Sequence, residues 1–556
     1  MSEASYATTQ GGQQVLILRG GSTQSRGRRA QSNNILAAKM IAGMVKTSLG
    51  PRGMDKMLVD SMGDVTITND GATMLKDMDI QHPAGKMIIE IAKAVDDEVG
   101  DGTTTSVVLA GALLEHAEEL IEKGVHPMVI INGYSKAAIQ AQRILDDISV
   151  DVEPDDRATL TKVARTSMAS KMVSSDSAAL GALVVDALLQ IVEKTAEGEF
   201  RVDLDDLKVE KKVGGSLRGT SLIRGIILDK EVVHSGMPKR IEKAKIALVC
   251  SALEIKKTEF DAKIDISKPA QIQQFMDEET RVLKSMVDKA SESGANVLIC
   301  QKGIDDIAQH YLAKAGILSI RRAKESDMVK LAKATGARMV TGLDGLTEAD
   351  VGQAGLVEER KIEEDKWTFV EGCKNPKAVT IFVRGGSQRV VDEAERSMHD
   401  AIMVVKDVLE NPRIVAGGGA VEEELSYRLL KWSSTLQGRE QLAAEKFAEA
   451  LEATPIALAV NAGFNPIDIQ VELREKHSEG KIWVGVDVLG KGAKDMFEKD
   501  VIEPVKVKVQ VVKSATECTC MILRIDDVVA SGRKGPSMPP GGPGGPGGAG
   551  GMEGMD

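Results

Sequence analysis

The spacing of apolar residues changes twice along the chain, and this change most constrains the fold. Near the N-terminus apolar residues recur every three to four positions, which predicts helices over 30–49, 84–99 and 103–123. Between about residues 220 and 375, short apolar runs alternate with helical stretches, which is typical of an α/β domain. Long helices return over 420–475. We therefore expect a multidomain α/β protein in which helical segments flank an α/β middle.

Short strands are expected at several places between these helices. In the middle of the chain the apolar runs predict strands at Ile246–Cys250, Asn296–Cys300 and Val379–Val383. Near the first helix, Met57–Val59 and Val65–Ile67 predict two more, the second ending in the turn signal Asn69-Asp70-Gly71. Near the C-terminus one further strand, half-buried, is predicted by valines alternating with polar residues: Val505, Val507, Val509 and Val511, with Lys506, Lys508 and Gln510 between them.

One insertion in the α/β middle stands out by its charge. Glu254–Lys268 is polar but contains scattered apolar residues, and Pro269 then opens a helix that continues past Val287. The pattern fits an arm that projects from its domain. It fits equally well a surface helix packed on that domain, and the sequence leaves both interpretations open.

Length and composition set the class of protein. With 556 residues, three or four domains of ordinary size are expected. The net charge of −12 is spread over the whole chain, which argues against nucleic acid as a partner. Neither a run of about 18 uncharged apolar residues nor a secretory signal is visible, so we expect no membrane partner and a cytoplasmic location.

Cysteine usage points the same way. The five cysteines form no CxxC pair, which favours a reducing compartment and argues against a disulfide framework. Cys518 and Cys520 have the spacing of half a metal site, but no second Cys or His pair lies near them. We interpret them as alternate residues of one strand.

The strongest local motif is Gly100-Asp101-Gly102-Thr103-Thr104-Thr105, between two predicted helices. Glycines let a backbone approach a ligand closely, and a helix start offers unpaired amides to an anion. Threonine hydroxyls add donors for phosphate oxygens, and Asp101 suits a Mg²⁺ ion bound together with phosphates. A plain helix cap explains the same residue types without any ligand.

Two further glycine-rich turns adjoin helices. Leu49-Gly50-Pro51-Arg52-Gly53 ends the first predicted helix, where a simple helix stop is the alternative explanation. Gly417-Gly418-Gly419 precedes another helix, so three turns on different helices could enclose one nucleotide. The segment from Gly485 to Lys491 has P-loop spacing but carries Gly492 where a Ser or Thr is needed, and we discard it.

Hydrolysis requires a group that accepts a proton from water. Asp70 and Asp400 are candidates, although isolated aspartates are more often solvated. The seven histidines form no HxxxH or HExxH motif, and no serine lies in a GxSxG elbow.

Four segments together resemble a known family. They are TSLGPRGMDKMLVD (47–60), TITNDGATML (66–75), VGDGTTTSVVLAG (99–111) and VAGGGAVE (415–422), followed by a Gly/Met-rich tail. The chain resembles the group II chaperonins, the family of archaeal thermosomes and of the eukaryotic cytosolic chaperonin, from about residue 15 to residue 531.

The resemblance implies a three-domain architecture. It implies a mainly helical equatorial domain, a small intermediate domain and an α/β apical domain with a helical protrusion at about 254–287. The expected division is a flexible segment 1–25, equatorial 26–152, intermediate 153–222, apical 223–375, intermediate 376–410, equatorial 411–531 and a disordered tail 532–556.

The resemblance also implies roles for individual residues. Asp400 is expected to be the general base, with Asp70 a second carboxylate beside the attacking water, and Asp101 is expected to hold Mg²⁺. The expected nucleotide-binding residues are Leu49, Gly50, Pro51, Asp101, Gly102, Thr103, Thr104, Thr105, Ser170, Lys171, Gly418, Asn461, Ala462, Gly463 and Glu503. Within this set, Lys171 would sense the γ-phosphate, and Glu503 would lie near the ribose.

The implied function is that of an ATP-dependent chaperone. Identical or paralogous subunits in two stacked rings of eight or nine would enclose unfolded client proteins under a built-in lid. Binding and hydrolysis of ATP with Mg²⁺ would drive closure. Two alternatives are an ATP-independent holdase or scaffold ring, and a soluble metabolic kinase. The holdase would not need the glycine turns with both Asp70 and Asp400, and the kinase would not need a projecting arm.

Overall fold

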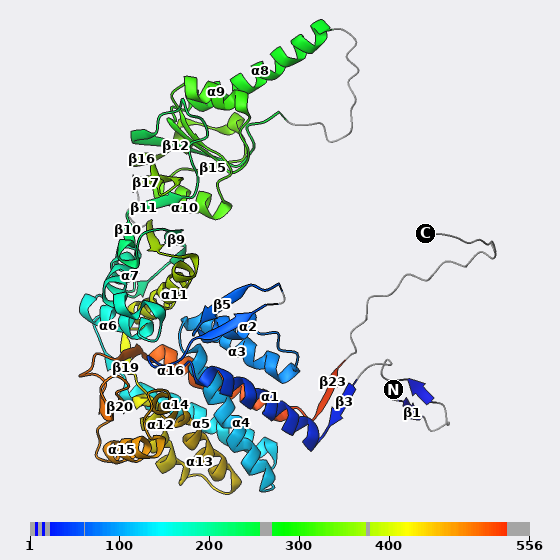
Figure 1. The fold of residues 1–556 in the computed structure, drawn as a ribbon, viewed down its shortest axis with the longest axis vertical. Helices are drawn as coiled ribbons and strands as arrows, with labels where there is room; N and C mark the ends of the chain where they lie inside the picture. Colours follow the sequence, from blue (N-terminus) through cyan, green and yellow to red (C-terminus); the bar gives the residue numbers. More distant parts are fainter. Residues whose placement is uncertain are drawn as a thin grey trace, which may run out of the picture.

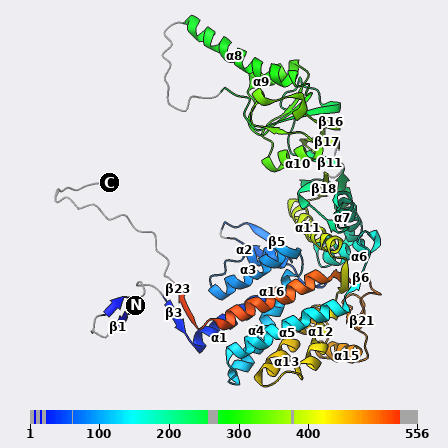
Figure 2. The same ribbon diagram turned by 180° about the vertical axis from the view of Figure 1, so that it is seen from behind.

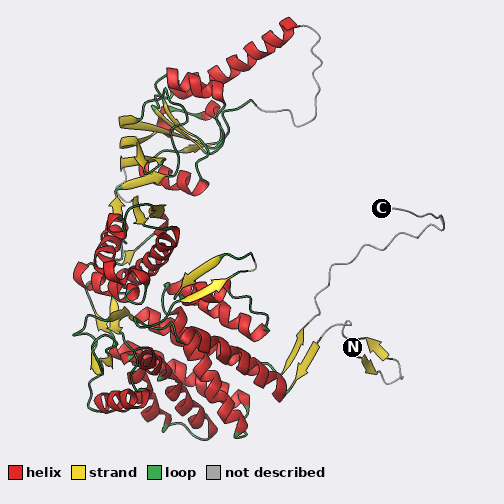
Figure 3. Ribbon diagram, viewed as in Figure 1, coloured by secondary structure: helices red, strands yellow, loops and turns green. Residues whose placement is uncertain are grey.

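Three blocks follow one another along the long axis of the molecule (Figure 1). The computed structural model describes residues 6–8, 14–16, 23–60, 62–255, 269–373 and 378–530. The base contains residues 23–152 and 411–530, the middle block contains 157–223 and 379–410, and the upper block contains 225–373. Helices dominate the base, whereas strands are concentrated in the upper block (Figure 3). The multidomain α/β architecture expected from the sequence is confirmed.

The base is a bundle of helices. Apolar stripes of its long helices, such as Ile88, Val95 and Val99 on α3, are fully buried and form one core with the middle block. Its helices are α1 (Arg28–Lys46), α2 (Gly71–Asp77), α3 (Pro83–Val99), α4 (Thr103–Glu122), α5 (Pro127–Ile148), α12 (Ala420–Ser433), α13 (Arg439–Leu451), α14 (Ala453–Asn461), α15 (Pro466–Ser478) and α16 (Val505–Arg524).

Short strand pairs lie around this bundle. The hairpin of β4 (Lys56–Val59) and β5 (Val65–Thr68) confirms both strands expected there. The others are β6 (Val150–Asp151), β19 (Arg413–Ala416) and β22 (Ile502–Pro504) in one sheet, the pair β20 (Val484–Val486) and β21 (Ala493–Asp495), and the pair β3 (Thr23–Arg26) and β23 (Asp527–Ala530).

The last of these pairs joins a strand from the N-terminal part of the described chain to one from its C-terminal part. Within residues 1–25, expected to be flexible, the structure describes the strand pair β1 (Tyr6–Thr8) and β2 (Gln14–Leu16) and most of β3. The tail expected at 532–556 lies outside the described residues.

The C-terminal strand expected at Val505–Val511 is wrong. These residues open α16, which lies along α4 and α5 in the base core (Figure 2). Cys518 and Cys520 belong to the same helix, so the interpretation that they alternate along a strand is wrong as well. Among the described residues no group of three or more His, Cys, Asp or Glu is arranged to hold a metal.

The middle block places three helices against a small sheet. The helices are α6 (Arg157–Met168), α7 (Ser177–Ile191) and α11 (Gln388–Glu410); the sheet contains β9 (Leu207–Val213), β18 (Val379–Gly385) and β10 (Ser221–Ile223), beside the pair β7 (Glu193–Lys194) and β8 (Phe200–Arg201). By length and composition alone, the stretch Met172–Ile191 could cross a membrane, contrary to the sequence expectation. Its helix α7 instead buries Val184 and Leu188 completely and packs against α6 and α11, as a core helix does.

The upper block has its own hydrophobic core around a seven-stranded mixed sheet. Its strands are β11 (Gly225–Leu228), β12 (Arg240–Val249), β13 (Val297–Cys300), β14 (Leu318–Ile320), β15 (Met339–Val340), β16 (Gly352–Ile362) and β17 (Asp365–Cys373), and its helices are α8 (Pro269–Glu292), α9 (Asp306–Lys314) and α10 (Glu325–Thr335). The strands and helices expected in this region are confirmed.

Helix α8 combines both interpretations of the charged insertion. Its C-terminal half buries Leu283 and Val287 in the upper-block core, whereas its N-terminal half, with Met276 54% exposed, extends away from the body (Figure 1). Residues 256–268 of the insertion lie outside the described part of the chain.

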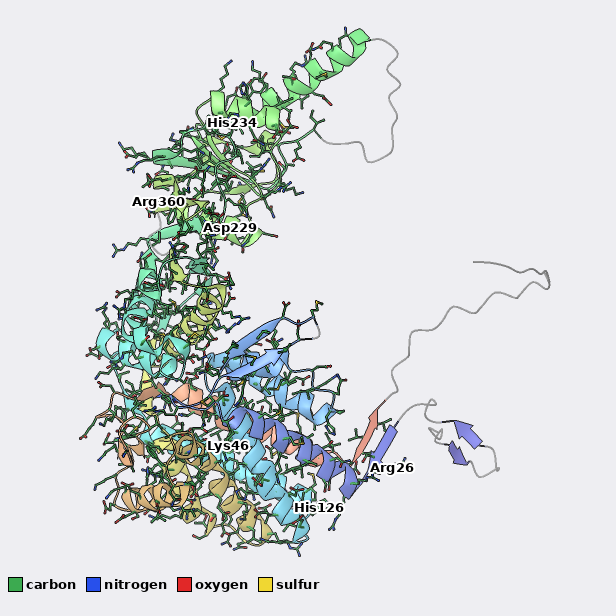
Figure 4. All side chains as sticks on the ribbon, viewed as in Figure 1. Arg26, Lys46, His126, Asp229, His234 and Arg360 are labelled. Atoms are coloured by element: carbon green, nitrogen blue, oxygen red, sulfur yellow. The ribbon has the colours of Figure 1, made fainter. Side chains whose placement is uncertain are left out.

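Ion pairs join the upper block to the middle block. Lys208 on β9 is buried and contacts Asp327 on α10 with 2.5 Å between Nζ and Oδ1. One turn further along α10, Lys330 donates to the carbonyl of Leu207 over 2.8 Å. Figure 4 shows Asp229 and Arg360 in the part of the upper block that faces this junction. These contacts fix the orientation of α10 on the middle block.

Three consecutive glutamates at the start of α12, Glu422, Glu423 and Glu424, are buried in the base. Burial, and next the neighbouring charge of Glu452, raises the pKa of Glu423 to about 7. This carboxyl group therefore ionises close to neutral pH inside the folded protein.

We expect Glu423→Gln to stabilise the protein at pH 8 but hardly at pH 5. Because the folded pKa lies above the unfolded value of 4.5, the stability that Glu423 contributes is complete below pH 4.5 and is lost as the pH rises through 7. Glutamine is neutral at every pH, so the substitution should raise the free energy of unfolding by about 3 kcal/mol at pH 8 and by less than about 1 kcal/mol at pH 5. Denaturant midpoints at both pH values measure the effect. Exposed Glu498→Gln is the control, and an equal gain at both pH values would contradict the prediction.

Candidate functional site

The turn before α4 is built to receive an anion. Gly100 and Gly102 adopt φ angles of +68° and +81°, a left-handed conformation that favours glycine. Gly102 is the N-cap of α4 and has no side chain that could cap the helix, its own amide donates to Oδ1 of Asp101 over 2.6 Å, and the first turn of the helix contains no acidic residue. The hydrogen bond from Gly102 to Asp101 agrees with the plain-cap alternative, but the amides of Thr103–Thr105 also lie at the positive end of the helix dipole, where an anion can bind.

Asp70 is brought to this turn by a close approach of two helix starts. It is the N-cap of α2 and accepts a hydrogen bond of 2.8 Å from the amide of Thr73. The next residue, Gly71, lies so close to α4 that a Cβ atom there would be 2.5 Å from Oγ1 of Thr104. Only glycine permits this approach, which places the Asp70 carboxylate beside the start of α4.

Asp400 reaches the same place from the middle block. It lies on α11, and its neighbour on that helix, Met403, packs so closely on Gly100 that a Cβ atom at Gly100 would overlap it. Lys171, which follows α6, forms ion pairs with Asp400 and with Oδ1 of Asp70, the latter at 3.5 Å. A base residue and two middle-block residues therefore meet in one buried cluster.

The protonation of this cluster follows from burial and charge. Burial raises the pKa of Asp400 well above its ordinary value, although Lys171 opposes the shift. Burial acts in the same direction on Asp70, but Lys171 and the bonds from Thr73 outweigh it and hold the pKa of Asp70 below its usual value. Burial alone would lower the pKa of Lys171, but Asp400 and Asp70 raise it, so the lysine remains charged.

Two further bonds hold the middle block to the base beside the cluster. The hydroxyl of Thr68, on β5, donates to Oε2 of Glu393 on α11 over 3.3 Å. The side-chain amide of Asn69 donates to the carbonyl of Ser170. Glu393 was not among the expected site residues, and an isolated glutamate on a helix gives no sequence signal for this contact.

The turn at Leu49–Pro51 lies against α14. Gly50 has φ +79°, and a Cβ atom there would overlap the side chain of Leu458. The amide of Asn461 donates to the carbonyls of Leu49 and Lys46, at 2.9 and 3.0 Å. Figure 4 labels Lys46 where α1 ends inside the base. The Nδ2 group of Asn461 therefore fastens this turn to the end of α14.

The residues after Asn461 complete this end of the site. Ala462 is the C-cap of α14, and Gly463 follows with φ +78°. The sequence predicts that Ala462 and Gly463 lie beside the nucleobase. In the structure they directly follow α14, whose last residue, Asn461, donates to the carbonyl of Leu49.

The third turn, Gly417–Gly419, contacts both neighbouring parts of the site. A Cβ atom at Gly417 would be 2.5 Å from Oε1 of Glu503, and one at Gly419 would be 2.8 Å from Cβ of Pro455 on α14. Gly418, with φ +65°, lies against Met496. The turns at Leu49–Pro51 and Gly417–Gly419 both pack against α14, and Gly417 also lies against Glu503. The structure therefore places these two predicted turns and Glu503 near one another.

The donor set fits a magnesium nucleotide. Lys171 contacts the carboxylates of Asp70 and Asp400, and the charge of Asp101 also helps to raise the pKa of this lysine. Oxygen ligands suit Mg²⁺, which is ordinarily held by one or two carboxylates together with substrate phosphates. The amides at the start of α4 are the donors that a phosphate group would need.

Comparison with known proteins identifies the family. The model of the TCP-1/cpn60 chaperonin family matches residues 41–533. The chain belongs to this family. It is 56% identical over 540 residues to the thermosome subunit alpha of Archaeoglobus fulgidus, covering 96% of this chain and 99% of that one. It is 55% identical over 520 residues to a thermosome subunit of Methanopyrus kandleri, covering 94% and 95%.

A solved structure agrees with the family. The open-state monomer of a group II chaperonin from Methanococcoides burtonii matches with a TM-score of 0.59 and 46% identity, over 77% of this chain and all of that one. The expected architecture is therefore confirmed. As a group II chaperonin, the protein is an ATP-dependent chaperone and an ATPase.

Proposed function

We propose that this chaperonin hydrolyses ATP with Mg²⁺ at the contact between base and middle block. The turns at Leu49–Pro51 and Gly417–Gly419 would hold the nucleoside, with Glu503 at the ribose. The amides and hydroxyls of Thr103–Thr105 would bind phosphate oxygens, and Asp101 would hold the metal. Bound Mg²⁺ would neutralise charge that develops on the phosphates.

The observation that carries this proposal is the position of Lys171. This buried lysine lies between Asp70 of the base and Asp400 of the middle block. Asp400 accepts a proton from water only when Lys171 releases its carboxylate, and a γ-phosphate offers Lys171 another anionic partner. Hydrolysis is then coupled to the fit between the two blocks, because Asp400 is held by α11 and Asp70 by α2.

In this proposal the base, the middle block and the upper block are the equatorial, intermediate and apical domains. Subunits assemble as two stacked rings of eight or nine in the cytoplasm, and α8 contributes to a lid over unfolded client protein. Large apolar side chains exposed on the hairpin β4–β5 and the adjoining turns support contacts between subunits: Met54, Met57, Val59 and Met62. In the upper block, exposed Met276, Ile307 and Val329 support binding of unfolded chains.

We expect unfolded protein to raise the ATPase rate of the purified assembly. A client that favours one arrangement of the blocks must also change nucleotide affinity or turnover. Phosphate release is measured with and without a denatured protein, the native form of that protein is the control, and electron micrographs of the sample show the rings. Binding of clients without any effect of nucleotide would favour the holdase, and a phosphorylated small product would favour the kinase.

A further inference from the structure

Lys508 is a buried cation that the proposed mechanism does not use. It is the fourth residue of α16, and only 8% of its side chain is exposed. Its Nζ lies 2.6 Å from Oε2 of Glu503 on β22 and 2.9 Å from Oε1 of Glu422 in the first turn of α12. One ammonium therefore joins three elements: α16, the strand that carries Glu503, and the helix that follows Gly417–Gly419.

The same turn of α16 also touches the phosphate turn. A Cβ atom at Gly102 would lie 3.0 Å from Val507 and 2.8 Å from Val511, which are one turn apart on the face of α16 next to Lys508. Lys508 thus fixes its carboxylate partners relative to a helix segment that supports Gly102. Glu503 in turn lies against Gly417, where a Cβ atom would be 2.5 Å from its Oε1.

The charge balance makes this contact sensitive to a change at Lys508. Two carboxylates face one ammonium, and Oε2 of Glu422 has no hydrogen-bond partner among the described residues. Burial would lower the pKa of Lys508, but Glu422 and Glu503 raise it, so the lysine stays charged. Removing the ammonium would leave the buried carboxylate of Glu422 beside the half-buried carboxylate of Glu503 with no cation between them, and Glu503 would then turn away or take up a proton.

We infer that Lys508 is a positioning residue for the nucleotide: it orients the Glu503 carboxylate and fixes its spacing from the Gly102 turn. The inference rests on the proposed placement of Glu503 at the ribose. Lys508 touches neither substrate nor metal in this role. It sets the distance between the groups that bind the sugar and those that bind the phosphates.

Binding of ADP and 2′,3′-dideoxy-ADP to the full-length assembly, measured by calorimetry, tests this inference without relying on turnover. A hydrogen bond between a ribose hydroxyl and a carboxylate predicts that the wild type prefers ADP about tenfold. Lys508→Met keeps the length of the side chain and removes its charge, and we expect it to reduce the preference to less than about twofold. Glu503→Gln should do the same.

Lys513→Met, an exposed position on the same helix, is the matched control and should keep the wild-type preference. If Lys508→Met does not fold, the double variant Lys508→Met, Glu422→Gln removes one of the opposed charges and carries the same expectation. A preference that survives in both Lys508 variants but is lost in Glu503→Gln overturns the role of Lys508 alone. Equal binding of both nucleotides by the wild type, or no binding of either, overturns the ribose placement and this inference with it.

Discussion

Asp400→Ala is expected to lower the rate of ATP hydrolysis about 100- to 10,000-fold, the usual contribution of a general base. The affinity for ATP should stay within about threefold of the wild type, because the substitution leaves unchanged the α4 amides that we propose as phosphate donors and the turn at Leu49–Pro51. Asp70 also remains as a partner for Lys171. Single-turnover hydrolysis and equilibrium binding of ATP measure the two quantities separately.

Asp392→Ala is the matched control for this variant. Asp392 lies two turns earlier on α11, pairs with Lys211 at 2.7 Å, and is partly exposed. Its loss should change turnover less than about twofold. Normal turnover by Asp400→Ala would remove Asp400 from the mechanism, and a parallel loss of ATP binding would assign it to binding instead.

Gly71→Ala is expected to reduce turnover about 100-fold through a single added methyl group. The new Cβ atom would be 2.5 Å from Oγ1 of Thr104 and 2.9 Å from its amide nitrogen, so the starts of α2 and α4 must separate. Such a shift moves Asp70 away from the α4 amides that we propose as phosphate donors, and a displacement of about 1 Å at a reacting centre can cost about 100-fold in rate. Overpacking should also cost about 1–3 kcal/mol of stability.

Gly43→Ala separates this effect from the general effect of alanine in a helix. Gly43 lies within α1, and a Cβ atom there meets nothing within 4 Å. This control should match or slightly exceed the wild type in stability, since alanine favours helices more than glycine does. Turnover and thermal midpoints of both variants are compared, and normal turnover by Gly71→Ala would show that the two helix starts need not touch.

Local chemistry in the sequence was enough to predict the glycine turns and most helices. Gly100 and Gly102 mark the end of α3 and the start of α4, because glycine adopts positive φ at little cost, whereas α1 ends at Lys46, four residues before Gly50 and three residues before the predicted end. The apolar periods of α3 and α4 are long and regular, so their predicted bounds lie within a residue of the structure.

The start of α16 could not be predicted in this way. Alternating valines and lysines indicate a strand with one solvent-exposed face. Lys508 is instead buried beside Glu422 and Glu503, so the residues that the pattern assigns to the exposed face are partly buried. Those partners lie on other elements, and no local pattern reveals them. The contact between Glu393 and Thr68 could not be predicted either, because the two residues are 325 positions apart in the sequence.

Because α16 is buried in the base, the hydrophobic core of this block cannot form until α16 has been synthesised. Its residues Val511, Ala515 and Ile522 pack in the core with α3, α4 and α5, yet they are synthesised about 400 residues after those helices. At 5–20 residues per second, the N-terminal helices wait on the order of tens of seconds for this helix. The upper block is continuous in the chain and has its own core, so it can mature meanwhile. A nascent subunit therefore exposes apolar surface during much of its translation. It is then at risk of aggregation, as are the unfolded chains that a chaperonin binds.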